Sequence, residues 1–373
     1  MLTYNHVMFS EADHDYMTRA LRLAQRGLFT ATPNPRVGCV LVKEGRVIAE
    51  GWHARAGEAH AEAMALQAAG AQAAGATAYI TLEPCSHFGR TGPCADALLR
   101  AGVARVFAAM EDPNPQVAGR GLQRLRAAGI EVRCGLLQQE AEQLNCGFVS
   151  RMTRQRPWVR SKLAASLDGK TALQNGASQW ITSAAARADG HAWRARACAL
   201  LTGSGTVHAD NPWLNVREVE TPRQPLKVVV DGRLMTSPAA RLLGGAPVWI
   251  ATATQDPARE KDLRDRGADI LFLPGKHVPD DFQVDLHALM HTLAQREINE
   301  VHVEAGTRLN TALLAAGLID ELLLYVAPSL LGPGRELFNL PVLEQLPLTQ
   351  AWEFIDVQKV GSDVRLRLQR KVE

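Results

Sequence analysis

Strand-like apolar segments alternate with helix-like segments along most of this chain. In the first half, residues 37–52 read as two strands joined by a tight turn, a helix follows from His60 to Gly70, and residues 77–82 read as a buried strand. Such alternation is typical of a mainly parallel sheet covered by helices. The pattern therefore predicts an α/β fold.

The alternation pauses once, in the basic stretch CGFVSRMTRQRPW at residues 146–158. A chain of 373 residues is too long for one hydrophobic core, and ordinary domain sizes suggest two domains. We place the boundary in the pause, so that the first domain covers residues 1–152 and the second covers 153–373. The second half resumes the alternation and ends in an expected antiparallel hairpin over 352–370, which predicts a second α/β domain with a mixed sheet.

The charge balance excludes some classes of partner. The 41 basic and 39 acidic residues give a net charge of +2, which is too small to attract nucleic acid or an anionic membrane through a global field. The first residues lack the pattern of a signal peptide, and no run of eighteen apolar residues occurs. We therefore expect a cytoplasmic protein that has neither a nucleic-acid nor a membrane partner. Six scattered cysteines do not suggest a secreted disulfide framework.

Three side chains that can bind metal lie close together in the sequence. His60 stands at the start of a predicted helix, and Cys85 and Cys94 flank a loop that contains glycine and proline. Catalytic zinc usually has three protein ligands and an open fourth position, whereas structural zinc has four protein ligands. We predict that these three residues bind one catalytic zinc ion per chain. The alternatives are two inert buried cysteines with a surface histidine, or a structural zinc with His87 as its fourth ligand.

Glu62 follows His60 by two residues, which on a regular helix places the two side chains about 200° apart. At a helix start, both can still reach one cavity. A carboxylate beside zinc can move a proton from water to a leaving amine, as in deaminases with the order H-x-E…P-C-x-x-C. This chain has HAE followed by PC…C, although eight residues instead of two separate its cysteines. We predict that Glu62 carries this proton; the alternative is a solvated carboxylate favoured by the helix dipole.

Eight segments carry a resemblance to a known family: NPRVGCVLV, AGEAHAEAMAL, TLEPCSHFGRTGPC, EDPNPQVAGRG, SLDGKTA, SQWITS, TVHADNPWLNVR and VEAGTRL. In these the chain closely resembles the bifunctional riboflavin-biosynthesis deaminase/reductases, from about Glu11 to Leu368. The resemblance implies a cytidine-deaminase-like three-layer α/β/α domain followed by a dihydrofolate-reductase-like α/β domain.

The implied function is two consecutive reactions. The first is zinc-dependent hydrolytic deamination of 2,5-diamino-6-ribosylamino-4(3H)-pyrimidinone 5′-phosphate, and the second is NADPH-dependent reduction of the ribosyl group to ribityl. The implied partner is this phosphorylated pyrimidine, and we expect a homo-oligomer. The alternative is a single-function zinc deaminase with an inert second domain.

The resemblance also implies which residues bind the ligands. Around the pyrimidine and its ribose phosphate it places Asn34, His53, His87, Arg90, Asp112 and Asn114. For the substrate of the reductase it implies Ser178, Arg194, Leu214, Arg217 and Glu304. For NADPH it implies Ala164, Trp180, Thr206, Asp210, Gly306, Thr307, Arg308, Leu309, Asn310 and Thr311.

General chemistry supports part of this set. An arginine side chain is a planar fork that binds phosphate through paired hydrogen bonds. The segment from Gly306 to Thr311 lies between a predicted strand and a helix start, where free N–H groups suit a pyrophosphate. The segment TGSGTVHAD resembles a phosphate loop but lacks the third glycine of G-x-G-x-x-G, so a standard Rossmann site is not supported.

Overall fold

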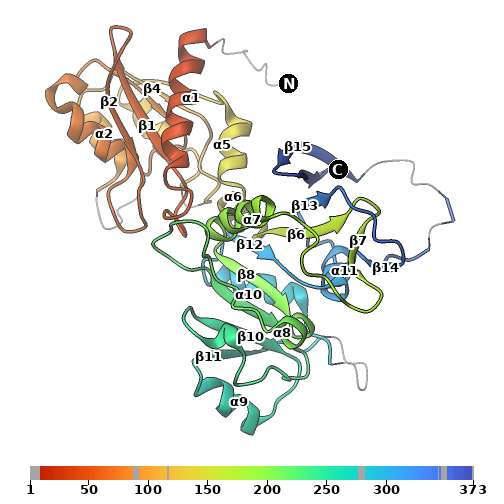
Figure 1. The fold of residues 1–373 in the computed structure, drawn as a ribbon. Coiled ribbons are helices and arrows are strands. Elements are labelled where there is room, and N and C mark those ends of the chain that lie inside the picture. The colour runs from red at the N-terminus through yellow and green to blue at the C-terminus, as the bar shows by residue number, and fades with distance from the viewer. Residues whose placement is uncertain are drawn as a thin grey trace. The chain divides into compact units, whose positions relative to one another are not determined.

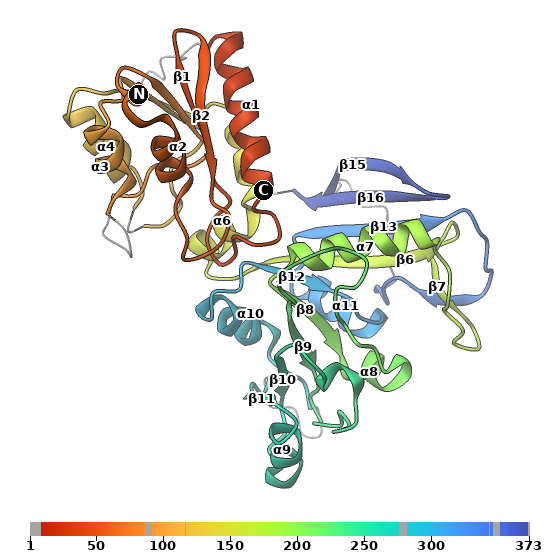
Figure 2. The same cartoon turned by 60° about the vertical axis from the view of Figure 1, so that its left-hand side comes forward.

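The computed structural model describes residues 9–86, 92–115, 117–275, 282–342, 344–345 and 351–371. The chain divides into two compact units, Met1–Arg154 and Gln155–Glu373. Figures 1 and 2 show the helices and strands of both units. In the described part of the chain, no helix is both long and apolar enough to cross a membrane.

The first unit contains a five-stranded sheet in the order β2-β1-β3-β4-β5. The strands are β1 (Gly38–Lys43), β2 (Arg46–Trp52), β3 (Thr77–Ile80), β4 (Arg105–Ala108) and β5 (Glu131–Cys134). Strand β1 runs antiparallel to β2 and β3, whereas β3, β4 and β5 are parallel. Glu44 and Gly45 both have positive φ, 51° and 73°, as the two-residue turn of a twisted hairpin requires. The predicted turn is therefore confirmed.

Helices cover both faces of this sheet, which confirms the three-layer prediction. They are α1 (Glu11–Gln25), α2 (Ala61–Ala69), α3 (Cys94–Arg100), α4 (Arg120–Ala127), α5 (Gln138–Leu144) and α6 (Cys146–Arg154), with a short 3-10 helix η1 (Gly70–Ala73) after α2. Alternate residues of β1 enter different cores: Cys39 and Leu41 pack with residues of α2 and α3, whereas Val40 and Val42 pack with residues of α1. The strand is thus buried on both faces. The stretch 146–158, in which the alternation pauses, is helical as far as Arg154.

The second unit contains a nine-stranded sheet in the order β11-β10-β9-β8-β12-β6-β13-β16-β15. The strands are β6 (Trp158–Ser166), β8 (Ala199–Gly203), β9 (Leu226–Val230), β10 (Val248–Thr252), β11 (Ala268–Phe272), β12 (Glu300–Val303), β13 (Glu321–Ala327), β15 (Trp352–Val360) and β16 (Asp363–Arg370). The seven strands from β11 to β13 are parallel, and β16 is antiparallel to β13 and to β15. The predicted mixed sheet and closing hairpin are confirmed. Strands β7 (Lys170–Leu173) and β14 (Gly334–Glu336) form a separate ribbon.

The strand order of the second unit predicts where a ligand binds. From β8 the chain moves outward through β9, β10 and β11, and β12 then returns to lie between β8 and β6. In open parallel sheets, ligands bind outside the carboxyl ends of the strands at such a switch point. The helices of this unit are α7 (Ala184–Arg196), α8 (Ser204–Asp210), the 3-10 helix η2 (Arg241–Leu243), α9 (Pro257–Arg264), α10 (Leu286–Gln295) and α11 (Thr307–Ala315). Helices α8 and α11 begin at or just after the carboxyl ends of β8 and β12, so their first turns lie at the switch point.

Candidate functional site

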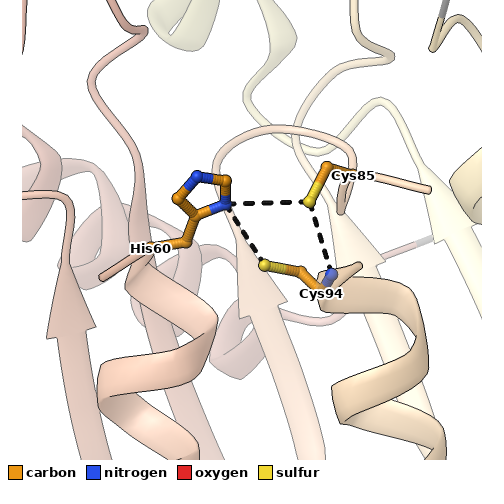
Figure 3. A group of neighbouring side chains, drawn as sticks. All are labelled: His60, Cys85 and Cys94. Carbon is orange, nitrogen blue, oxygen red and sulfur yellow. Dashed lines mark hydrogen bonds between the residues drawn. The ribbon is translucent and has the colours of Figure 1, made fainter. Parts of the chain in front are cut away.

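Three metal-ligating side chains meet at one end of the first unit. His60 is the residue that caps the start of α2, Cys94 is the first residue of α3, and Cys85 lies in the segment after β3. The Nδ1 atom of His60 is 3.7 Å from Sγ of Cys85 and 3.3 Å from Sγ of Cys94 (Figure 3). The three ligand atoms all lie within 4.8 Å of one another. The prediction that these residues gather at one point is confirmed.

The spacing of these three atoms fits a zinc ion. Sulfur and nitrogen ligands at usual zinc distances, in a tetrahedron, are separated by about 3.6 Å. The distances from Nδ1 of His60 agree with this value. Two sulfurs with one imidazole are also the donor set of known catalytic zinc sites, in which the fourth position stays open. The structure describes no fourth protein ligand here; His87, the alternative fourth ligand, lies outside the described residues.

Local hydrogen bonds favour the charged form of one thiol. The backbone N–H of Cys94, at the start of α3, donates to Sγ of Cys85 over 3.3 Å. Hydrogen bonds from the Cys94 side chain and from His60 hold the pKa of the Cys85 thiol well below its usual value, against the effect of burial. A bound divalent cation deprotonates coordinating thiols outright. The site therefore favours thiolate ligands, which can bind a metal cation.

Glu62 lies in the first turn of α2 and is almost fully buried, with 3% of its surface exposed. Burial raises the pKa of its carboxyl group to about 7. Its side chain is a hydrogen-bond partner of the Cys94 side chain, so the carboxylate lies beside the cluster. His60 has extended backbone angles, φ −71° and ψ 160°, and therefore lies outside the helical rotation. This explains how two residues so close in sequence can face the same place.

Two residues predicted to bind the pyrimidine also lie beside the cluster. The ring of His53 is 5.5 Å from the ring of His60, measured between centroids, and the two rings are nearly perpendicular. Nδ1 of His53 is 3.1 Å from the carbonyl oxygen of Ala59, so it carries the proton, and Nε2 accepts from Nδ2 of Asn34 over 3.0 Å. Burial lowers the pKa of His53, which favours the neutral ring. Asn34 and His53 therefore form a fixed, neutral pair.

Two further predicted residues of this pocket, Asp112 and Asn114, lie in the loop after β4. Because β3 and β4 are parallel neighbours, this loop and the segment that carries Cys85 leave the sheet at the same edge. The N–H of Asn114 donates to the Asp112 carboxylate over 2.8 Å. His87 and Arg90 lie outside the described residues.

Glu83 is a residue that sequence reasoning missed. Its buried carboxylate accepts hydrogen bonds from four backbone N–H groups, those of Asp112, Gly119, Gly121 and Leu122. These bonds hold the loop after β4 against the segment that contains Cys85. No spacing rule singles out such a carboxylate, because its partners are backbone groups far along the chain.

In the second unit, a cavity of about 2000 Å³ opens at the carboxyl ends of the parallel strands. Every residue predicted there from the resemblance lines this cavity: Ala164, Ser178, Trp180, Arg194, Thr206, Asp210, Leu214, Arg217, Glu304, Gly306, Thr307, Arg308, Leu309, Asn310 and Thr311. The structure thus brings together fifteen residues that are spread over most of the second unit. The volume exceeds the usual size of a single small-molecule pocket, about 300–1,000 Å³, and can hold a dinucleotide with a sugar phosphate.

The side chains of Arg194 and Glu304 form an ion pair in the wall of this cavity. Nε and Nη2 of Arg194 donate to the two oxygens of Glu304, the second over 2.7 Å. Although burial opposes ionisation, the Arg194 guanidinium holds the pKa of Glu304 well below its usual range. The Nε–Nη2 side of Arg194 is therefore already used within the protein, and its Nη1 donates to the carbonyl oxygen of Asn215 over 3.0 Å. Arg217, in contrast, is exposed and uses Nη1 to contact Oδ1 of Asn215 over 2.7 Å.

The start of α11 is the part of the cavity that suits NADPH. Gly306 caps this helix, and the N–H groups of the first turn have no partner within a helix. A Cβ atom at Gly306 would meet Thr206 at 3.8 Å, so α11 and the start of α8 approach each other closely here. The side chain of Asn310 is used inside the protein, with Ser161 and the carbonyl of Ala305 as partners, and its backbone N–H donates to the carbonyl oxygen of Gly306 over 3.2 Å.

Among the cavity residues to which the sequence assigns no definite step are Lys162 on β6 and His191 on α7. Burial lowers the pKa of Lys162, while the nearby Glu304 acts in the opposite direction. A single lysine or histidine within a strand or helix pattern carries no signal of its position in a cavity. Their position in the cavity wall is seen in the structure.

Two family models match the chain. The model described as the cytidine and deoxycytidylate deaminase zinc-binding region matches residues 10–110. The model described as the RibD C-terminal domain matches residues 157–366, which is more than half of the chain. The two matches correspond to the two units of the structure.

Individual proteins match over nearly the full length. The riboflavin biosynthesis protein RibD of Escherichia coli K12 is 51% identical over 370 residues, covering 95% of this chain and 99% of the relative. The solved structure titled Acinetobacter baumannii RibD, form 1, has a TM-score of 0.88 at 43% identity, covering 97% of this chain and 99% of that one. A Thermotoga maritima structure, titled a diaminohydroxyphosphoribosylaminopyrimidine deaminase/5-amino-6-(5-phosphoribosylamino)uracil reductase, has a TM-score of 0.84 at 32% identity, covering 96% and 99%.

Proposed function

Because this chain belongs to the RibD family of riboflavin-biosynthesis proteins, with a zinc deaminase domain and an NADPH-using reductase domain, we propose which of its residues carry each reaction. The substrate of the first reaction in this proposal is 2,5-diamino-6-ribosylamino-4(3H)-pyrimidinone 5′-phosphate. The observation that carries the proposal is the buried carboxylate of Glu62 beside His60, Cys85 and Cys94.

In the deaminase domain, His60, Cys85 and Cys94 hold the zinc ion. When bound, zinc acts as a Lewis acid and lowers the pKa of water, which makes water a nucleophile at neutral pH. Glu62 accepts the proton of the attacking water and then gives it to the departing ammonia. The burial of Glu62 supports this role, because a carboxylate shielded from bulk water exchanges its proton with the reacting atoms.

The pyrimidine is held by groups that have fixed donors and acceptors. Asn34 and His53 are proposed to orient the ring, since their mutual hydrogen bond fixes both side chains next to His60. Asp112 and Asn114 are proposed to contact the ribose phosphate part, together with His87 and Arg90. The hydrogen bonds of Glu83 support this assignment, because they fix the loop that carries Asp112 and Asn114.

In the reductase domain, the proposed NADPH site is the start of α11 with Ala164, Trp180, Thr206 and Asp210. When bound, NADPH supplies a hydride, which reduces the ribosyl group to ribityl. Ser178, Arg194, Leu214, Arg217 and Glu304 are proposed to hold the sugar phosphate. Arg217 is the member best placed to bind phosphate, because its guanidinium is exposed to the cavity, whereas that of Arg194 is paired with Glu304.

One experiment tests both assignments. Ammonia release and NADPH oxidation are measured separately on the diaminopyrimidine substrate, and NADPH binding is titrated by fluorescence. We expect one ammonia for each NADPH oxidised. A chain that releases ammonia but does not bind NADPH would be a deaminase with an inert second domain.

The remaining parts of the proposal concern the location of the protein in the cell, its oligomeric state and its division into domains. A cytoplasmic location is supported by the six cysteines, which form no disulfide bond in the described part of the chain, because cytosolic thiols remain reduced. A homo-oligomer is supported by the exposed apolar side chains of Phe354 and Val357 on β15, and light scattering would test it. The division of labour between residues 1–152 and 153–373 is supported by the separation of the chain into two compact units near Arg154.

A further inference from the structure

The ring of His191, on α7, is enclosed in the wall of the reductase cavity, with 6% of the residue exposed. Its Nδ1 accepts a hydrogen bond from the backbone N–H of Arg217 over 3.2 Å. Its Nε2 lies 3.5 Å from Nη1 of Arg194. A backbone amide and a guanidinium can only donate, so both nitrogens of this ring face donors.

A neutral imidazole has one N–H and one acceptor nitrogen, so His191 can satisfy only one of these two neighbours. The contact with the Arg217 amide is the shorter, and it places the ring proton on Nε2. The Nε2–H then points at a second donor. In the described part of the chain no acceptor is paired with this N–H group. A buried donor without an acceptor is costly, which suggests that a ligand supplies one.

The charges around the ring keep it neutral. Burial, together with the cations Arg194, Arg217 and Lys162, lowers the pKa of His191 to about 4, and the opposing carboxylate of Glu304 does not reverse this. Arg194 has its Nε and Nη2 on Glu304, and its Nη1 donates to the carbonyl oxygen of Asn215 over 3.0 Å. The second N–H of Nη1 is the one that faces His191. Two donor groups thus lie 3.5 Å apart in the wall of the cavity.

We infer that Nε2 of His191 and Nη1 of Arg194 together donate to one phosphate oxygen of the sugar-phosphate substrate. Two donors 3.5 Å apart can share one acceptor at ordinary hydrogen-bond lengths of about 2.9 Å. A phosphate oxygen only accepts, whereas a sugar hydroxyl brings a further proton to place. The nearby cations Arg217 and Lys162 also favour an anion. This inference rests on the proposed function, because it takes the ligand to be the phosphorylated substrate of the reductase.

Two substitutions of the same residue separate the two ring nitrogens. In His191→Asn, the short amide can accept from the N–H of Arg217 but leaves no donor at the position of Nε2. In His191→Gln, the longer amide can place an N–H at that position. The probe is ribose 5-phosphate, studied by calorimetry with the full chain saturated with NADPH, and inorganic phosphate serves as a second probe.

We expect His191→Asn to weaken the binding of ribose 5-phosphate and of inorganic phosphate by about tenfold or more, as for a lost hydrogen bond to a charged group. His191→Gln should stay within about threefold of the unaltered chain on the same reasoning. The Kd of NADPH and the Tm should be unchanged in both variants. These two readouts distinguish a lost ligand contact from a general loss of structure.

Three results would overturn the inference. The first is unchanged binding of both probes by His191→Asn, and the second is an equal loss of affinity in both variants. The third is weaker binding of ribose 5-phosphate with unchanged binding of inorganic phosphate, which would place the contact on the sugar. Failure of the proposed function looks different. The unaltered chain would then bind ribose 5-phosphate, with the expected effect of His191→Asn, and yet fail to oxidise NADPH with the deaminated substrate.

Discussion

The Nδ1 atom of His60 lies 3.3 Å from the Sγ atom of Cys94, although the two residues are 34 positions apart. Each stands at the start of a helix, His60 as the cap of α2 and Cys94 as the first residue of α3. The two helix starts therefore meet at one point, where their dipoles favour thiolate sulfur. Cys85 and Glu62 complete the group, and the predictions for the deaminase domain depend on it.

Glu62→Gln should abolish deamination while zinc content and reductase activity persist. The amide keeps the shape of the side chain but cannot carry the proton, and loss of general acid–base catalysis costs about 10²- to 10⁴-fold in rate. Ammonia release, bound zinc and NADPH oxidation of the predeaminated substrate are the three measurements. Glu58→Gln, which changes an exposed carboxylate nearby, is the matched control and should behave as the unaltered chain. Comparable deamination by Glu62→Gln would remove Glu62 from its role.

Arg217→Ala should raise the KM of the reductase about tenfold or more, with a smaller change in kcat, because a phosphate contact worth about 1.5–3 kcal/mol is lost. The measurement is NADPH oxidation as a function of substrate concentration. Arg266→Ala removes an exposed arginine that does not line the cavity and serves as the control. An unchanged KM would count against a phosphate contact at Arg217.

Arg160→Met should destabilise the reductase domain by about 3 kcal/mol or more, the cost of breaking a buried ion pair from one side. The Arg160 side chain is fully buried, 3.2 Å from Glu300 and 2.9 Å from Glu321, and its removal leaves two buried carboxylates with fewer partners. Urea unfolding measures the difference. Arg264→Met removes an exposed pair with Glu260 at 3.5 Å and should cost less than about 1 kcal/mol. Equal effects of the two substitutions would contradict the account of this network.

The stability of the chain relative to His191→Gln should fall as the pH is lowered from 6.5 toward 4. The pKa of His191 is lowered from 6.5 to about 4 in the folded state, so between these values the unfolded state binds more protons. The free energy of unfolding therefore falls as the pH is lowered through this window, and the loss is complete below it. We expect the gap in unfolding free energy to change by about 2 kcal/mol or more, since one pKa unit corresponds to about 1.4 kcal/mol. A gap that is constant from pH 7 to pH 4 would show that His191 titrates normally.

Much of the fold could be predicted because the local signals agree with the tertiary structure. The turn at Glu44 and Gly45, the helix that ends at Gly70 and the closing hairpin all have turn or capping residues at the observed positions. The zinc ligands could be predicted because their spacing and residue types are specific. The helical rotation that seemed to separate Glu62 from His60 does not apply, because His60 lies just before the helix.

Other features depend on contacts that the sequence does not display. Helix α6 lies in the basic stretch where the alternation pauses, and its polar, basic residues and Gly147 give little helical signal, although Phe148 and Ser150 are buried. The role of Glu83 depends on four backbone N–H groups from a distant loop. The unusual surroundings of His191 arise from Arg194 and Arg217 together.

The central claim, a catalytic zinc ion held by His60, Cys85 and Cys94, is tested most directly by zinc content and ammonia release in Cys94→Ala. Zinc affinity should fall by more than about a hundredfold, since even a lost outer hydrogen-bond partner costs about 10- to 100-fold. Ammonia release should be lost with it, while NADPH oxidation of the predeaminated substrate continues. Cys134→Ala, a half-buried thiol outside the cluster, should keep both zinc and deamination. Full zinc occupancy and normal ammonia release in Cys94→Ala would contradict the claim.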